Sequence, residues 1–216
     1  MLSVALLKCN KSKRKIMDAK LSFIYGVMSS GKTLRLLATA HDFDTKRIPI
    51  LVIKPSVDNR DSETKVVARV GLERKCIPIE STINLFKMVD DINHMRLAEG
   101  DVPIKHLLVD ECQFLTEEQI DQLSNIVDYL GINVKCYGLR TDFMSNVFPA
   151  SKRLFEISDK IEEIESLCDC GNKASINARF DENGRIITTG GQILIGGNDK
   201  YRPICRKCWK KLLNEK

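Results

Sequence analysis

The sequence has no apolar run that approaches the roughly 18 residues of a membrane-spanning helix, so we expect no membrane partner. Internal repeats and low-complexity tracts are also missing, so neither a repeat architecture nor a compositionally biased linker is predicted. At the N-terminus the apolar residues Met1 to Leu7 precede the basic residues, whereas a secretory signal has the opposite order. These absences favour a globular protein without a secretory signal.

A strong excess of charge of one sign is absent as well. The net charge is only +5, and much of it lies between Lys8 and Lys20. A short basic run of this kind is more often a solvated tail than a nucleic-acid site. We therefore predict that residues 1–19 are a disordered basic extension, and we expect no nucleic-acid partner. The length of 216 residues suits one medium domain with a small appendage.

A phosphate-binding motif directly follows the apolar run Leu21–Tyr25. It fits the pattern G-x-x-x-x-G-K-T and consists of Gly26, Val27, Met28, Ser29, Ser30, Gly31, Lys32 and Thr33. Glycines let backbone N–H groups close around phosphate oxygens, and the helix that follows directs its positive end at them. Lys32 can reach the β- and γ-phosphates, and the Thr33 hydroxyl can bind Mg²⁺. The motif therefore predicts that the chain binds a nucleoside triphosphate.

Four short apolar runs predict buried strands, and they alternate with segments of helical periodicity. The predicted strands are Leu21–Tyr25, Ile50–Ile53, His106–Val109 and Val134–Gly138. The predicted helices are marked by Leu34, Leu37, Ala38 and His41; by Leu85, Val89 and Ile92, from near Ser81; and by Ile120, Leu123, Val127 and Leu130. The last of them should begin at a capping box, Thr116 to Gln119, and end at Gly131. This alternation predicts an α/β fold, a P-loop domain at residues 20–163 with a parallel sheet and ligands at one edge.

Acidic residues follow the third predicted strand. Asp110 and Glu111 come directly after His106–Val109, where a P-loop protein places a magnesium ligand and a group that can accept a proton. The alternative is that Asp110 caps the next segment and Glu111 is solvated.

A second polar group follows the strand that ends near Pro55. In the sequence Asp58-Asn59-Arg60, the arginine can neutralise charge on a transferred phosphoryl group and the aspartate can assist the metal. A surface turn with a salt bridge is the alternative.

Four of the eight cysteines form two close pairs. Cys168 and Cys170 are spaced C-x-C, and Cys205 and Cys208 are spaced C-x₂-C. Use of ATP indicates a reducing compartment, the cytoplasm, where disulfides are disfavoured. Four thiolates make a closed tetrahedral Zn²⁺ site with a structural role, and free thiols are the alternative. We predict a small zinc-binding domain at residues 164–216, which encloses a turn signal and a loop bracketed by glycine pairs.

Together these motifs resemble the type II thymidine kinases, the zinc-bearing deoxynucleoside kinases of cells and large DNA viruses. The resemblance covers residues 20 to 212 and rests on Gly26–Thr33, Asp58–Arg60, Asp110–Phe114, Tyr137–Phe143, the cysteine pairs and Gly190–Tyr201. It implies transfer of the ATP γ-phosphate to the 5′-hydroxyl of thymidine, with Mg²⁺ and a structural Zn²⁺. It also implies a lasso loop at Gln192 to Tyr201 that folds over the nucleoside.

The resemblance implies roles for individual residues. Glu111 would accept the proton, and Lys32 and Arg60 would act on the phosphates. The implied ATP and Mg²⁺ site is Gly26, Val27, Met28, Ser29, Ser30, Gly31, Lys32, Thr33, Asp58, Asn59, Arg60, Asp110, Glu111, Cys112 and Gln113. The implied thymidine site is Phe114, Phe143, Gln192, Ile193, Leu194, Ile195, Gly196 and Tyr201. By spacing alone, the aromatic members of this set are equally suited to the core.

The resemblance further implies homodimers or homotetramers and feedback binding of thymidine triphosphate. The main alternative function is a nucleic-acid-dependent ATPase with a zinc ribbon, because Asp110 to Gln113 also resembles the helicase D-E-x-Q box. Helicases need two such domains, for which this chain is too short. A third possibility is a nucleotide sensor without turnover, in which Glu111 has no catalytic role.

Overall fold

A six-stranded parallel sheet organises the computed structural model, which describes residues 19–58, 62–192 and 200–214. In spatial order its strands are β5 (Ile77–Ile79), β2 (Ile50–Pro55), β6 (His106–Val109), β7 (Asn133–Gly138), β1 (Leu21–Gly26) and β8 (Lys160–Ile164). Every neighbouring pair in this order is parallel. The α/β prediction and its four strands are confirmed, and the edge strands β5 and β8 are additions to them.

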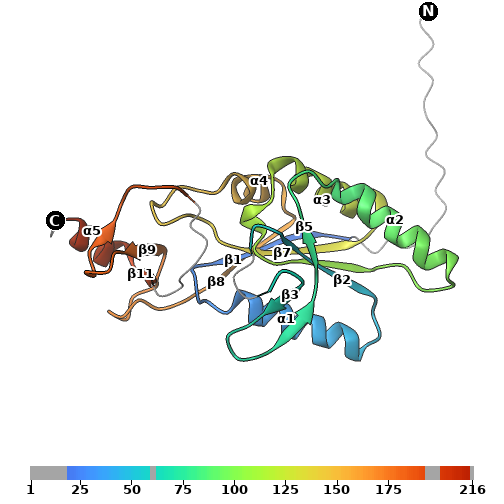
Figure 1. The fold of residues 1–216 in the computed structure, drawn as a ribbon, viewed down its shortest axis with the longest axis horizontal. Coiled ribbons are helices and arrows are strands. Elements are labelled where there is room, and N and C mark those ends of the chain that lie inside the picture. The colour runs from blue at the N-terminus through green and yellow to red at the C-terminus, as the bar shows by residue number, and fades with distance from the viewer. Residues whose placement is uncertain (1–18, 59–61, 193–199, 215–216) are drawn as a thin grey trace, which may run out of the picture.

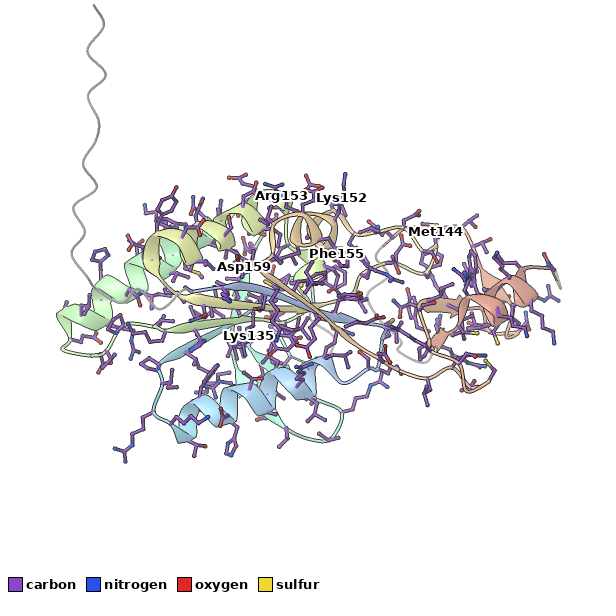
Figure 2. The ribbon with its side chains drawn as sticks, turned by 180° about the vertical axis from the view of Figure 1, so that it is seen from behind. Lys135, Met144, Lys152, Arg153, Phe155 and Asp159 are labelled. Carbon is purple, nitrogen blue, oxygen red and sulfur yellow. The ribbon has the colours of Figure 1, made fainter. Side chains whose placement is uncertain are left out.

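Helices cover both faces of the sheet (Figure 1). One face packs against α1 (Lys32–Thr45), and the other against α2 (Leu85–Ala98), α3 (Glu117–Leu130) and α4 (Pro149–Ile157). The four central strands β2, β6, β7 and β1 are mostly buried, as a parallel sheet covered on both sides requires. Figure 2 shows Phe155 of α4 directed at the sheet, where its ring lies 5.1 Å from those of Phe23 and Tyr25.

The predicted ends of α3 are confirmed. The Thr116 hydroxyl accepts from the Gln119 N–H at 3.1 Å, Gln119 Oε1 accepts from the Thr116 N–H at 3.2 Å, and Gly131 ends the helix at φ 65°. By contrast, α2 begins at Leu85, later than the expected start near Ser81, because Asn84 is its N-cap and accepts from the Lys87 N–H.

The buried face of α1 differs from the prediction. Leu36, Leu37 and Ala40 are buried, whereas Leu34 and His41 are exposed. The reason lies at the start of the helix, where Lys32 is turned inward to the phosphate-binding loop. Residues four and eight positions after Lys32 share its face, so the helix buries that side.

A short antiparallel hairpin lies beside α1. It consists of β3 (Lys65–Val67) and β4 (Glu73–Lys75), and no pattern in the sequence predicted it. Val66 packs into the same apolar cluster as Leu36, and Arg74 forms an ion pair with Asp44 of α1. These contacts fix the hairpin against α1.

The C-terminal region has a sheet of its own and an apolar cluster that also includes Val27 of the phosphate-binding loop. β9 (Ile176–Phe180) lies between β10 (Ile186–Ile187) and β11 (Tyr201–Ile204) in an antiparallel sheet, and α5 (Arg206–Asn214) follows. Figure 1 shows this region at one end of the parallel sheet. The predicted boundary at residue 164 falls where β8 ends and stays a prediction. Every described helix is too short or too polar to cross a membrane.

Candidate active site

The loop between β1 and α1 forms a tight turn. Ser29 and Gly31 both adopt left-handed backbone conformations, with φ of 62° and 84°. Such alternation directs backbone N–H groups toward one concave point, which suits an anion. A Cβ at Gly26 would lie 2.5 Å from Ser30 Oγ and 2.7 Å from Ile164 O, so this position has no room for a side chain.

Two side chains at the start of α1 connect this loop to β6. The Lys32 ammonium is buried and donates to Val27 O at 2.8 Å. The Thr33 hydroxyl donates to Asp110 Oδ2 at 3.2 Å. Burial, and next the negative charge of Glu111, raise the pKa of Asp110 to about 7, against the opposing effects of Thr33 and Lys32. A bound cation would favour the ionised form of Asp110. Carboxylate oxygens are ligands of the kind that Mg²⁺ prefers.

Glu111 is held in a defined position after β6. Its φ is 48°, and Gln113 Nε2 donates to Glu111 Oε2 at 2.5 Å. Gln113 belongs to the 3₁₀ turn η1 (Cys112–Phe114), and its Oε1 accepts from the Leu139 N–H at 2.9 Å. Gly138 makes this arrangement possible, since a Cβ there would lie 2.6 Å from Gln113 Oε1 and 2.5 Å from Cys112 Sγ.

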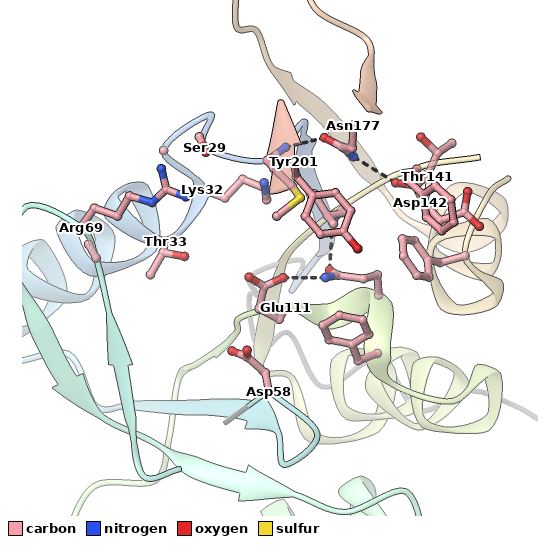
Figure 3. Close-up of a pocket in the computed structure, with 18 of the residues that line it drawn as sticks. Ser29, Lys32, Thr33, Asp58, Arg69, Glu111, Thr141, Asp142, Asn177 and Tyr201 are labelled. Carbon is pink, nitrogen blue, oxygen red and sulfur yellow. Dashed lines mark hydrogen bonds between the residues drawn. The ribbon is translucent and has the colours of Figure 1, made fainter. Parts of the chain in front are cut away.

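A cavity of about 410 Å³ extends from the phosphate-binding loop past Glu111 to a group of aromatic rings (Figure 3). The predicted site residues that line it are Met28, Ser29, Gly31, Lys32, Thr33, Asp58, Glu111, Gln113, Phe114, Phe143, Gln192 and Tyr201. Those outside its lining are Gly26, Val27, Ser30, Asp110 and Cys112. Cys112 is completely buried beside Cys136, and this burial raises the pKa of its thiol well above the usual range.

Aromatic side chains from three segments meet at the far end of the cavity. Phe114 packs edge-on against Phe148, with ring centroids 6.0 Å apart. The guanidinium of Arg179, on β9, lies 5.2 Å from the centre of the Phe143 ring and 6.0 Å from that of Tyr201. Cation–π contacts of this kind fix the two rings relative to β9.

Several predicted residues lie outside the described part of the chain, and others in the cavity were missed. Those outside are Asn59, Arg60, Ile193, Leu194, Ile195 and Gly196. The missed lining residues include Arg69 of the β3–β4 hairpin, Asp142 and Asn177. Figure 3 shows Arg69 on the same side of the cavity as Thr33. No signal in the sequence pointed to Arg69, because its hairpin was itself not predicted, and none pointed to Asn177.

The four paired cysteines converge in the C-terminal region. The sulfur atoms of Cys168, Cys170, Cys205 and Cys208 all lie within 4.8 Å of one another. Asn172 Nδ2 donates to Cys170 Sγ at 3.3 Å, and hydrogen bonds from Asn172 lower the pKa of that thiol to about 6. Four thiols this close fit a tetrahedral metal site and are compatible with zinc.

The parallel sheet, the loop after β1 and the acidic residues after β6 define a protein of the P-loop class, which binds nucleoside triphosphates. A sequence model of the thymidine kinase family matches residues 19–209. Curated thymidine kinases with high similarity include those of Lactobacillus acidophilus (39% identical, covering 87% of this chain and 94% of the relative) and Coxiella burnetii (41%, 88% and 94%). That of Idiomarina loihiensis is 40% identical over 90% of this chain and 98% of its own. The chain belongs to the thymidine kinase family and is an ATP-dependent kinase, a transferase that uses a divalent metal ion.

Proposed function

We propose that this chain transfers the γ-phosphate of ATP to the 5′-hydroxyl of thymidine, in nucleotide salvage for DNA synthesis. The observation that supports this best is that Lys32, Glu111 and the aromatic rings share one cavity. A triphosphate on the loop after β1 and a nucleoside among the rings would place the two reacting groups beside Glu111. Phosphoryl transfer depends mainly on such positioning and on neutralisation of charge.

In the proposed step, the 5′-oxygen of thymidine forms a bond to the γ-phosphorus. The bond from phosphorus to the β–γ bridging oxygen breaks, and its electrons leave with ADP. Glu111 accepts the hydroxyl proton while Gln113 holds its carboxylate. Lys32, together with Arg60, offsets the charge on the phosphates. Mg²⁺, which Thr33 and Asp110 would hold, supplies further positive charge there.

The nucleoside subsite in this proposal combines described and undescribed residues. Phe114, Phe143 and Tyr201 would contact thymidine, with Gln192 and the lasso residues 193–196 over it. Closure over the nucleoside would exclude water, which otherwise competes as acceptor. Zn²⁺ on the four cysteines would have a structural role, because a closed tetrahedral site leaves no position for a substrate.

Further properties are proposed from the resemblance to the family. We expect a cytoplasmic homodimer or homotetramer that thymidine triphosphate inhibits. Exposed apolar side chains on α2 and α3, namely Met95, Leu97 and Tyr129, support an interface between copies. We expect neither a membrane nor a nucleic-acid partner.

Phosphate transfer from γ-labelled ATP tests the proposal directly. Purified protein should form labelled thymidine monophosphate when thymidine is present, and single-stranded DNA should not stimulate release of free phosphate. DNA-stimulated ATP hydrolysis without labelled thymidine monophosphate would instead support the alternative, a nucleic-acid-dependent ATPase. Binding of both ligands without any turnover would support a nucleotide sensor.

A further inference from the structure

One buried side chain connects the C-terminal sheet to both ends of the cavity. Asn177, on β9, is only 3% exposed. Its Oδ1 accepts from the Met28 N–H in the phosphate-binding loop at 2.7 Å, and its Nδ2 donates to Thr141 O at 3.1 Å (Figure 3). A single orientation of the amide satisfies both bonds, because the oxygen only accepts and the nitrogen only donates. Three segments that are distant in sequence therefore meet at one side chain.

The two partners of Asn177 belong to different parts of the substrate site. Met28 lies in the loop proposed to hold the triphosphate, and Thr141 is two residues before Phe143, which lines the nucleoside end. We infer that Asn177 is a positioning residue that couples the ATP subsite to the nucleoside subsite. This inference rests on the proposed function, since it needs both ligands to bind in this cavity.

The position of Asn177 within its sheet suits this role. β9 is the central strand of its sheet, and Asn177 lies opposite Pro203 of β11. Arg179, two residues further on, lies on the same face of the strand as Asn177. Its guanidinium contacts the Phe143 and Tyr201 rings. A central strand is a more rigid support than a loop, so a shift of one loop that Asn177 contacts is transmitted through β9 to the other loop.

Loss of the amide would leave a half-buried N–H of Met28 and a buried C=O of Thr141 without their partner. The two loops would then move independently, and each ligand would have to order its own loop. In the parent protein, one ligand orders both loops through Asn177, so it should tighten binding of the other. Because such coupling is reciprocal, the same factor should be found from either ligand.

The test is calorimetric binding of a non-hydrolysable ATP analogue, with and without thymidine, to the full chain. Asn177→Leu keeps the approximate shape and removes both bonds. It should raise the dissociation constant of the analogue about tenfold, the effect of one buried hydrogen bond, and abolish the coupling with thymidine. Asn93→Leu is the matched control, because Asn93 Oδ1 accepts from the Ile104 N–H at 2.9 Å away from the cavity. It should lower stability and leave both dissociation constants unchanged.

Asn177→Ser, which is smaller and tolerates a nearby water, replaces the leucine variant if that one does not fold. A folded variant with the dissociation constants and coupling of the parent would overturn the inference. An equal change in Asn93→Leu would also overturn it, since the effect would then be general loss of stability. If the parent protein binds both ligands independently, the inference about Asn177 is wrong and the proposed function is unaffected. If the parent protein binds neither ligand, the proposed function is contradicted as well.

Discussion

The parallel-sheet region and the C-terminal region differ in what stabilises them. Beneath the helices of the sheet region lie continuous layers of buried Leu, Ile and Val side chains from β1, β2, β6 and β7 and from the helices on both faces. The cluster of the C-terminal region is small, two of its buried members are Cys168 and Cys205, and α5 contributes no buried residue. Burial of apolar area can therefore stabilise the first region, whereas the second is of the size at which bound metal supplies folding free energy.

The same comparison places the proposed chemistry in the sheet region and divides recognition of the nucleoside between the two regions. The groups proposed to act on phosphate and proton lie in the sheet region, and Asn177, Gln192 and Tyr201 line the cavity from the C-terminal side. Substitutions of Lys32 or Glu111 should therefore change the rate, and those in the C-terminal region should change affinity.

Glu111→Gln should have the largest effect, a fall in kcat of ~10²–10⁴-fold, because the amide cannot accept the 5′-hydroxyl proton. Steady-state kinetics with parallel calorimetry should show that ATP and thymidine still bind. Glu99→Gln, on an exposed residue that ends α2, is the control and should match the parent. A raised KM with unchanged kcat would mean that Glu111 binds substrate and is not the base.

Lys32→Ala should lower kcat by at least ~10²-fold, or about 2.7 kcal/mol, because charge on the leaving phosphates would be uncompensated. Lys46→Ala is the control, since that ammonium forms an exposed ion pair with Asp42. Half of the parent activity in Lys32→Ala would remove the assignment of the phosphate-binding loop.

Cys205→Ser should release the metal and weaken thymidine binding about tenfold, because a segment freed of the metal must be ordered again by the ligand. ATP affinity should fall less, by the part transmitted through Asn177 and Met28. Elemental analysis should give about one zinc per chain in the parent and almost none in the variant. Cys76→Ser, a half-buried thiol outside the cluster, should retain the metal. Zinc-free parent protein would refute the site.

Thr116→Ala should have the smallest effect, a loss of about 1 kcal/mol in the free energy of unfolding from the missing cap of α3. Denaturant unfolding measures it, and zinc content and kcat should not change. Thr45→Ala is the control, because its hydroxyl only donates to the His41 carbonyl at the exposed end of α1. A loss of metal in Thr116→Ala would show that the two regions are not separable in the way proposed here.

The features that sequence could predict depend on neighbouring residues. The strands β1, β2, β6 and β7 are apolar runs, the capping box of α3 spans four residues, and the phosphate-binding loop is one continuous motif. The cysteine pairs are each local too, and their spacing favoured a shared metal site over free thiols, in agreement with the close sulfur atoms.

The features that sequence could not predict depend on distant contacts. β8 reads Lys-Ile-Glu-Glu-Ile, which has no apolar run, and it becomes a strand only by pairing with β1. Arg69 reaches the cavity because its hairpin rests on α1, and Asn177 because β9 packs against the phosphate-binding loop. The buried face of α1 belongs to the same group, because Lys32 and the sheet determine it jointly.

The absence of a side chain at Gly138 limits how this sequence can change over generations. An alanine there would require both Cys112 and Gln113 to move, and Gln113 holds the carboxylate of Glu111. Gly138 does not line the cavity, so a survey of tolerated substitutions would find a constrained position with no substrate contact to explain it. Natural variation at the end of β7 is thus restricted by Cys112 and Gln113, the neighbours of Glu111. A substitution at Gly138 would require compensating substitutions in the η1 turn.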